Sequence, residues 1–197
     1  MANRILTVPN QLTFLRLGFL PFFIIFVLYR HYSWALAILL LAALTDFMDG
    51  TLARTLQQKT ALGAYLDPIA DKLLLSSSFV ALSLTGQIRW WLTILVLGRD
   101  VLILITAAVI LATVGYRPFP PSIYGKITTT LEIFLVFVVL MIAVVNGEGY
   151  SHTFETLRKL LSYLVAGFTI FSGFHYSVVV ARGLSQPPAD PAKQQTR

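Results

Sequence analysis

The sequence predicts an all-α protein with six membrane-spanning helices, and two observations lead to this prediction. Of the 197 residues, 56% are hydrophobic and only 12% are charged, and the mean hydropathy is +0.75. The apolar residues form long consecutive runs with the charged residues between them, whereas one soluble domain of this length could not bury so much apolar surface. Membrane-spanning strands would instead alternate apolar and polar residues.

Six runs are long enough to cross the hydrocarbon core of a membrane, which is about 30 Å thick and needs roughly 20 helical residues. The first run follows Arg4 but has no small-residue cleavage pattern after it, so we interpret it as a span and not as a signal peptide. The second and third runs flank the polar segment TLQQKT, which predicts an antiparallel pair. The expected spans are 12–29, 34–54, 61–84, 91–114, 125–146 and 159–182.

The spans form a single expected domain, 1–183, followed by a proline-containing tail, 184–197, that is expected to be disordered. The distribution of lysine and arginine predicts that the tail and the N-terminus are cytoplasmic, because ten cations then lie on or near the inner side and four lie outside. The inner cations are Arg4, Arg16, Arg54, Lys59, Lys72, Arg117, Lys126, Arg182, Lys193 and Arg197, and the outer ones are Arg30, Arg89, Arg158 and Lys159.

The charge and the composition restrict the partners. A net charge of +6 indicates contact with anionic lipid headgroups and anionic substrates, and no basic patch with interleaved aromatic residues indicates nucleic acid. The absence of cysteine excludes disulfides and thiolate metal sites. Since His31, His152 and His175 share no ligand spacing, a metal would have to be held by oxygen ligands.

Four aspartates stand together in a chain that has few charges. Asp46 and Asp49 lie three residues apart at the inner end of the second span, and Asp67 and Asp71 lie four apart at the inner start of the third. Each pair therefore shares a helix face, and the two pairs can face each other at a similar depth. A solvated helix cap is the structural alternative, but carboxylates within a membrane are costly and are seldom kept without a role.

Four carboxylates this close would repel one another unless cations neutralised them. Hard divalent cations such as Mg²⁺ or Mn²⁺ take carboxylate oxygens, and two such ions would balance the four charges. The small residues Gly50, Ala53 and Gly63 would let a ligand or the facing helix approach the backbone closely, although packing alone could also explain the glycines. Arg54, one turn beyond Gly50, could pair with a phosphate oxygen.

These residues resemble a known signature. The spacing Asp46-x2-Asp49-Gly50-x2-Ala53-Arg54-x8-Gly63-x3-Asp67-x3-Asp71 matches that of the CDP-alcohol phosphotransferase family at every fixed position. The segments VPNQLTFLRL, LDPIADKLL, YGKITTTLE and TIFSGFHY look like bacterial phosphatidylglycerophosphate synthases and one-domain cardiolipin synthases. The likeness extends, in order, over nearly the whole chain up to Arg182.

The resemblance implies a homodimer of six-helix subunits whose active site opens to the cytoplasm. It implies a CDP-diacylglycerol-dependent phosphatidyltransferase, in which CDP-diacylglycerol gives its phosphatidyl group to an alcohol and CMP leaves. Carried over by position, Asp46, Asp49 and Asp67 are metal ligands, and Asp71 is near the metals and acts as the base for the acceptor hydroxyl. The CDP moiety would be bordered by Asp49, Gly50, Ala53, Arg54 and Gly63.

The resemblance implies that the acceptor alcohol is glycerol 3-phosphate or phosphatidylglycerol, about equally, with inositol phosphate, serine and choline as less favoured alternatives. Members of the family that use glycerol 3-phosphate carry Arg-Glu where this chain has Arg99–Asp100, and another Arg where it has Ala107. We expect Arg99, Lys126, Arg117 and Arg16, with support from Asn10 and Thr13, to surround an acceptor phosphate. The structural alternative is that Arg99 and Asp100 form buried pairs with other helices, for example with Glu132.

A divalent-cation transporter or channel is the alternative function, since it would also need a membrane cavity with carboxylates. All four aspartates lie at one membrane face, however, and no acidic pair matches them near the outer ends of the spans. Alternating access or conduction favours sites on both sides, so the enzyme is the preferred hypothesis.

Overall fold

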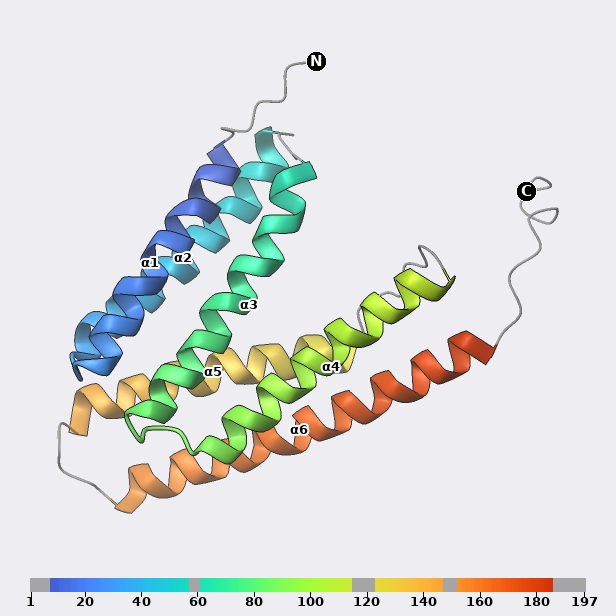
Figure 1. The fold of residues 1–197 in the computed structure, drawn as a ribbon. Coiled ribbons are helices and arrows are strands. Elements are labelled where there is room, and N and C mark those ends of the chain that lie inside the picture. The colour runs from blue at the N-terminus through green and yellow to red at the C-terminus, as the bar shows by residue number, and fades with distance from the viewer. Residues whose placement is uncertain (1–7, 57–60, 115–122, 147–151, 186–197) are drawn as a thin grey trace.

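The computed structural model describes residues 8–56, 61–114, 123–146 and 152–185, and within these ranges the side chains of 8–12, 47–56, 61–68, 107, 110–114, 146 and 179–185 lie outside what it describes. The described residues form six helices and no strand, which confirms the predicted all-α class. The helices are α1 (Val8–Leu28), α2 (Tyr32–Leu56), α3 (Ala61–Leu84), α4 (Trp90–Val114), α5 (Ile123–Asn146) and α6 (His152–Ser185) (Figure 1).

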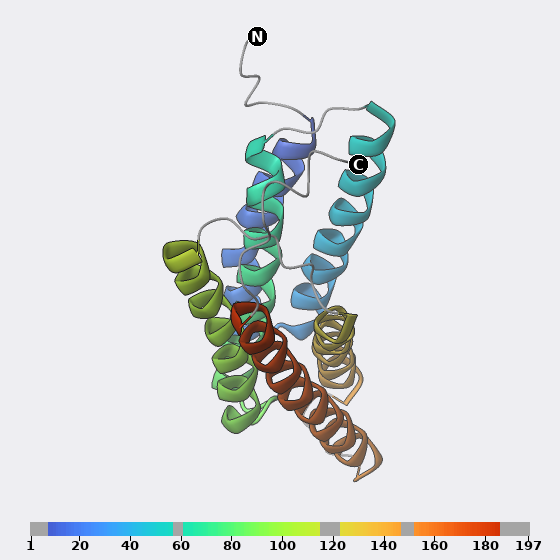
Figure 2. The same ribbon diagram turned by 90° about the vertical axis from the view of Figure 1, so that its right-hand side faces the viewer.

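The helices form two groups of three. α1 packs against α2 and α3, and α6 packs against α4 and α5. The groups contact each other through α2 with α5 and through α3 with both α4 and α5. In Figure 1 the groups meet near the α3–α4 turn and spread apart toward the other end, and Figure 2 shows α4 and α5 on either side of α6.

The helices agree with the expected spans to within two residues, except at the start of α1, which begins four residues before 12, and at the ends of α6. That helix begins at His152, whereas the expected span began at 159, because the hydropathy criterion finds only the part that crosses the hydrocarbon core. An ion pair of 2.7 Å between Lys159 Nζ and Glu155 Oε1, one turn apart, supports the polar extension. At the other end α6 continues to Ser185, so the first two residues of the predicted tail are helical.

The predicted number of membrane spans is only partly matched by a test of helix length and hydropathy. Within the part of the chain that the structure describes, one helix segment, Ile123–Val145, is long and apolar enough to cross a membrane by itself. Two shorter apolar segments are Thr13–Leu28 and Tyr32–Asp46. Large apolar side chains are nevertheless exposed on the other helices too, among them Phe22, Leu44, Leu84, Leu104 and Phe174. Such surfaces are rare on a monomer that is surrounded by water.

Two turns with the same geometry close the helical hairpins. At the end of α1, His31 N–H donates to Phe26 C=O at 2.8 Å and Arg30 N–H donates to Val27 C=O at 3.0 Å. Gln87 and Gly86 make the equivalent bonds after α3, at 2.8 and 3.1 Å. This Schellman pattern needs one left-handed residue, and the two are Arg30 with φ 60° and Gly86 with φ 75°.

The buried core lies where the two groups meet. Phe79 of α3 is fully buried there, and a buried hydrogen bond of 2.5 Å joins Ser83 Oγ to Thr93 Oγ1 across the α3–α4 hairpin. The rest of the core comes from all six helices and includes Phe23, Val27, Ala35, Leu75, Leu82, Leu92, Val96, Leu135, Val139, Leu140 and Val165. The core thus fixes the relative positions of α3, α4 and α5, the helices that carry most of the buried polar groups.

We expect Phe79→Ala to destabilise the protein by about 3–5 kcal/mol, because it leaves a cavity at the meeting point of the two groups. Leu104→Ala is the control, since Leu104 lies on α4 with 68% of its surface exposed, and it should change stability by about 0.5 kcal/mol or less. Unfolding in detergent micelles measures both variants. Equal stabilities would show that Phe79 is not a core residue.

Candidate active site

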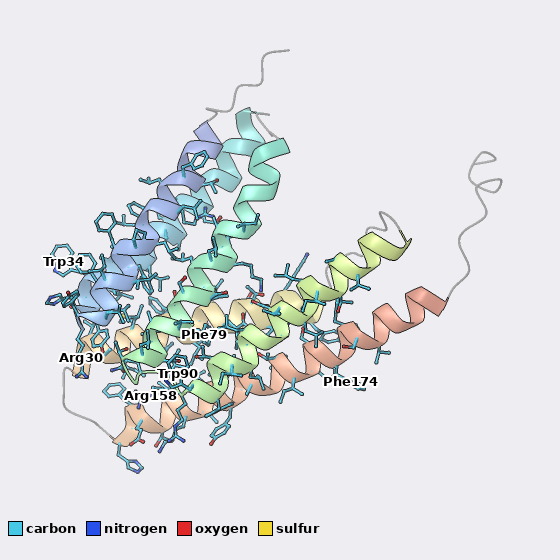
Figure 3. The ribbon with its side chains drawn as sticks, viewed as in Figure 1. Arg30, Trp34, Phe79, Trp90, Arg158 and Phe174 are labelled. Atoms are coloured by element: carbon cyan, nitrogen blue, oxygen red, sulfur yellow. The ribbon has the colours of Figure 1, made fainter. Side chains whose placement is uncertain are left out.

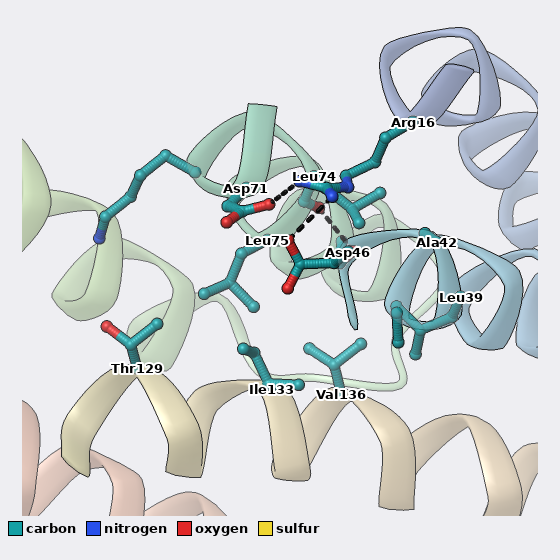
Figure 4. Close-up of a pocket in the computed structure, with 13 residues that line it drawn as sticks. Arg16, Leu39, Ala42, Asp46, Asp71, Leu74, Leu75, Thr129, Ile133 and Val136 are labelled. Carbon is teal, nitrogen blue, oxygen red and sulfur yellow. Dashed lines mark hydrogen bonds and ion pairs between the residues drawn. The ribbon is translucent and has the colours of Figure 1, made fainter. Parts of the chain in front are cut away.

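Arg16 of α1 joins two of the four aspartates that the sequence singles out. Its Nη1 donates to Asp71 Oδ1 at 2.5 Å, and its Nη2 donates to Asp46 Oδ1 at 2.8 Å. The side chain of Arg16 is only 2% exposed, whereas those of Asp46 and Asp71 are 57% and 53% exposed. The guanidinium therefore joins the two carboxylates and holds them together, while both carboxylates remain open to a ligand (Figure 4).

These three side chains stand at one end of a cavity of about 360 Å³. Figure 4 shows Asp46 and Asp71 across from α5, with Ile133 and Val136 on the facing helix. Apart from the charged end and a few hydroxyls, the lining is apolar, and it includes Leu39, Ala42, Leu74, Leu75, Ile133 and Val136. A cavity with carboxylates at one end and an apolar remainder suits an amphipathic ligand.

The backbone explains why Asp46 and Asp71 meet. Asp46 lies ten residues before the end of α2, and Asp71 lies ten residues after the start of α3. At 1.5 Å per residue each is roughly 15 Å along its helix from the α2–α3 connection, so antiparallel packing brings them to the same level. The second and third spans were predicted to bring their aspartates face to face at a similar depth. This prediction is confirmed for Asp46 of α2 and Asp71 of α3.

The remaining signature residues lie on the same two helices but outside the described side chains. Asp49, Gly50, Ala53 and Arg54 belong to α2, and Gly63 and Asp67 belong to α3. Among the side chains that the structure describes, no group of three or more His, Asp or Glu could hold a metal ion. Asp46 and Asp71 offer the hard oxygen donors that Mg²⁺ and Mn²⁺ prefer, so the described part of the site fits such an ion.

A second set of charges lies beside the cavity and involves Lys72, the residue after Asp71. The amine of Lys72 forms an ion pair of 2.5 Å with Asp100 Oδ2 of α4, although 43% of its side chain is exposed. Arg99 Nη1 donates to Asp100 Oδ1 at 2.8 Å, and Arg99 Nη2 donates to Ser172 Oγ of α6 at 3.0 Å. This chain of contacts connects α3, α4 and α6 at the level of the active site.

The structural alternative for Arg99 and Asp100 is confirmed in part, since Asp100 pairs with Lys72 of another helix, but the expected partner Glu132 is wrong. Arg99 is buried in an ion pair as that alternative expected, but the acid is Asp100 on the same helix and not Glu132 of α5. The side chain of Glu132 is fully buried, and neither of its oxygens has a hydrogen-bond partner among the described residues. Adjacent residues of a helix do not share a face, so reasoning from helix faces does not predict the contact between Arg99 and Asp100.

The expected acceptor residues are distributed unevenly. Arg16 lines the cavity. Arg99 does not line it, but it is connected through Asp100 to Lys72, which does. The side chain of Lys126, near the start of α5, is exposed, and Arg117 lies outside the described residues. Sequence reasoning missed Lys72 and Thr129, which both line the cavity. Lys72 could have been noticed, since it follows Asp71 directly and a cation within a span needs a partner.

The comparison with known protein families agrees with the site. Residues 6–171 match the family model described as CDP-alcohol phosphatidyltransferase, so the chain belongs to that family. The family is membrane-embedded and generally uses divalent metal ions, and its substrates are a CDP-alcohol and an alcohol acceptor. The matched range includes Arg16, Asp46, Asp71 and Arg99, and it ends inside α6.

Individual relatives come from two branches of the family. A Streptomyces coelicolor protein named cardiolipin synthase (CMP-forming) is 32% identical over 191 residues, which cover 92% of this chain and 86% of that protein. A Mycobacterium tuberculosis protein with the provisional name phosphatidylglycerophosphate synthase is 34% identical over 187 residues, 92% of this chain and 83% of its own length. Another, provisionally named cardiolipin synthase, is 38% identical over 128 residues, 64% of this chain, and the chain spans only 61% of its length.

Removing the guanidinium should separate the helices that carry the two carboxylates. We expect Arg16→Met to destabilise the protein by about 1–3 kcal/mol in EDTA, because two partly buried carboxylates lose their donor. Arg16→Lys should recover less than half of this loss, since one ammonium cannot reproduce two parallel N–H donors at fixed spacing. Thermal unfolding in detergent measures the effect, and Arg30→Met, at an exposed arginine, is the control. A wild-type melting temperature for Arg16→Met would disprove the structural role.

Proposed function

We propose that this chain is a CDP-diacylglycerol-dependent phosphatidyltransferase of membrane phospholipid synthesis. The acceptor is glycerol 3-phosphate or phosphatidylglycerol, as the resemblance implies, and relatives named as a cardiolipin synthase and as a phosphatidylglycerophosphate synthase support these two candidates. The observation that carries the proposal is the meeting of Asp46 and Asp71 over Arg16 at the charged end of an apolar cavity, in a chain of this family. The charged end suits the pyrophosphate and the apolar remainder suits acyl chains.

The site residues take the roles that the resemblance implies. Asp46, Asp49, Asp67 and Asp71 hold two divalent ions, either Mg²⁺ or Mn²⁺, and Asp49, Gly50, Ala53, Arg54 and Gly63 border the CDP moiety. Divalent ions held by these carboxylates would supply charge neutralisation for the pyrophosphate and for the departing CMP. Most of the catalysis by the chain itself then comes from positioning the two substrates and from excluding water.

The reaction needs one proton acceptor. The acceptor hydroxyl oxygen attacks the lipid phosphorus of CDP-diacylglycerol, and the bond from that phosphorus to the bridging oxygen breaks, so that CMP leaves with the electron pair. Asp71 takes the hydroxyl proton, since a carboxylate that is about half exposed at the cavity can reach a bound alcohol. Arg16 holds Asp71 in that direction through its Nη1.

The membrane arrangement belongs to the same proposal. The six helices span a bacterial inner membrane with both termini and the active site on the cytoplasmic side, and two chains form a homodimer, as the resemblance implies. Within the described residues, α1–α4 and α6 are not long and apolar enough to be recognised as membrane spans by themselves. Their exposed apolar residues support the proposal that they also cross the membrane. Short or polar-interrupted spans are tolerated where their polar groups line a cavity, as Asp46 and Asp71 do.

The reaction and its metal dependence can be tested together. Purified protein with CDP-diacylglycerol should release CMP only when an alcohol is present, and a panel of alcohols scored by lipid product identifies the acceptor. We expect EDTA to abolish this activity, and Mg²⁺ or Mn²⁺ to restore it, whereas Ca²⁺ should not, because its larger and looser coordination misplaces the phosphates. Full activity in EDTA would disprove the metal site. Ion flux in proteoliposomes without CMP release would favour the transporter alternative.

Two aspartate variants should separate binding from turnover. Asp46→Asn should weaken CDP-diacylglycerol binding, whereas Asp71→Asn should lower kcat by a factor of about 100 or more if Asp71 is the base. Ser177→Ala, at an exposed serine of α6, is the control. Steady-state kinetics with the identified acceptor measures both constants. If Asp71→Asn instead weakened only CDP-lipid binding, Asp71 would be a metal ligand and not the base.

Arg99 is the proposed acceptor residue whose role is hardest to separate from stability. If it helps to hold an acceptor phosphate, Arg99→Lys should raise the acceptor KM several-fold and leave the CDP-diacylglycerol KM unchanged, because lysine cannot make two parallel bonds. Kinetics should be measured with thermal unfolding on the same sample. A lower melting temperature with both KM values unchanged would restrict Arg99 to its contacts with Asp100 and Ser172.

A further inference from the structure

A second concave site lies at the α3–α4 turn, roughly 20 Å along the α3 axis from Asp71. It is a hollow of about 60 Å³ between that turn and the first turns of α6. Three cations line it, namely Arg89, Arg158 and Lys159. We call this hollow the Arg158 site. Figure 3 shows Arg158 at the same end of the molecule as Arg30, Trp34 and Trp90.

The positive charge of the Arg158 site is only partly balanced. Lys159 pairs with Glu155 at 2.7 Å, and the hydrogen bond from Lys159 holds the pKa of the Glu155 carboxyl below its usual range. Within the part of the chain that the structure describes, no carboxylate lies within ion-pair distance of Arg89 or Arg158. The carboxylate of Glu155 also attracts Arg158, but at a longer range than its contact with Lys159. Three cations thus share one nearby carboxylate, and the excess of positive charge favours an anionic ligand.

The side chain of Arg158 is held in place before any ligand arrives. Its Nη1 donates to Gln87 Oε1 at 3.3 Å, and Gln87 Nε2 donates to the hydroxyl of Tyr32 at 3.2 Å. Gln87 itself stands in the turn fixed by the left-handed Gly86. A guanidinium whose position is already set loses less conformational entropy when it binds a phosphate.

Aromatic and apolar residues place the Arg158 site at the level of lipid headgroups. The rings of Trp91 and Tyr163, which line the hollow, stack with centroids 5.6 Å apart, and Trp and Tyr are enriched at membrane interfaces. Ile94 lies one turn beyond Trp91, and Ile170 lies two turns beyond Tyr163, each on the same helix face. Both are exposed, so an apolar surface continues from the hollow toward the membrane interior.

We propose that the Arg158 site binds the phosphate of an anionic phospholipid, whose acyl chains lie along α4 and α6 over Ile94 and Ile170. In the proposed topology this end of the bundle faces away from the cytoplasm, where loop cations are normally few. A lipid phosphate accounts for cations at that position. The inference rests on the proposed membrane topology and not on the proposed reaction.

The test measures lipid binding to the full-length protein in detergent by native mass spectrometry. Phosphatidylserine is the probe, because its headgroup is neither of the proposed acceptors, and phosphatidylcholine is the neutral comparison. We expect a phosphatidylserine complex that phosphatidylcholine does not form. Arg158→Gln and Arg89→Gln should each weaken it about fivefold or more. Arg30→Gln, at an exposed arginine of the same end outside the hollow, should change it by less than about twofold.

The controls distinguish the lipid from other occupants. Arg89 makes no side-chain hydrogen bond or ion pair within the described ranges, so Arg89→Gln should keep the wild-type melting temperature even if Arg158→Gln does not. Unchanged binding in Arg89→Gln, equal binding of phosphatidylcholine, or displacement by millimolar inorganic phosphate would each overturn the proposal. Loss of a dimer in both variants would mean that a second chain covers the hollow, and this would overturn it as well.

Transferase activity separates this inference from the proposed function. Arg89→Gln should keep the wild-type kcat with CDP-diacylglycerol, since the hollow is remote from Asp46 and Asp71. If the wild-type protein released no CMP but still bound phosphatidylserine through Arg89, the reaction would be wrong and the lipid site would stand. If CMP release were normal and Arg89→Gln bound the lipid like wild type, only the lipid site would be wrong.

Discussion

The arrangement of the site depends on one buried guanidinium. Arg16 comes from α1, while the carboxylates that it binds come from α2 and α3, so a single side chain links the whole first group of helices at the level of the site. A buried arginine without acidic partners is costly, and two carboxylates without a cation repel each other. The arginine lowers the repulsion between the carboxylates, and the carboxylates offset the cost of burying the arginine. This explains how such charges can lie beside a largely apolar cavity.

A second polar layer joins the two groups of helices and is connected to the first through adjacent residues. Asp71 contacts Arg16, while Lys72 contacts Asp100 of α4, and Arg99 extends the layer to Ser172 of α6. The side chains of Asp71 and Lys72 point in different directions from α3. A rotation of α3 would therefore disturb both layers together. The position of Asp71 in the cavity is thus determined by contacts in both groups of helices.

Glu132 is the exception to charge pairing in this layer. It is fully buried on α5, one turn from Thr128, and its oxygens find no hydrogen-bond donor among the described residues. Arg99 and Lys72 both direct their charge to Asp100 instead. Replacing a buried carboxylate that has no donor by an isosteric amide or an apolar residue is often neutral or stabilising, so Glu132 contributes little to holding the bundle together.

Much of the fold and part of the site could be predicted from the sequence. Long apolar runs show the helices, and the three- and four-residue spacings put the aspartates on shared faces, so the meeting of Asp46 with Asp71 followed from periodicity and a short connection. The role of Arg16 as their common partner could not be predicted, because it depends on which face of α1 packs against α2 and α3. The start of α6 at His152 was missed because that segment is helical without being apolar.

The structure also shows which cations can be counted when the membrane orientation is predicted from the distribution of lysine and arginine. That rule concerns cations in loops and near the ends of spans, which interact with the membrane surface during insertion. Arg16 is buried between two carboxylates, and the amine of Lys72 is buried against Asp100, so neither is a surface cation. Of the ten inner cations, these two therefore say little about orientation. Arg89 and Arg158 at the other end are surface cations, yet a bound lipid phosphate would offset their charge. The predicted orientation then depends on the cations of the α2–α3 and α4–α5 connections and of the two termini, which still outnumber those at the far end.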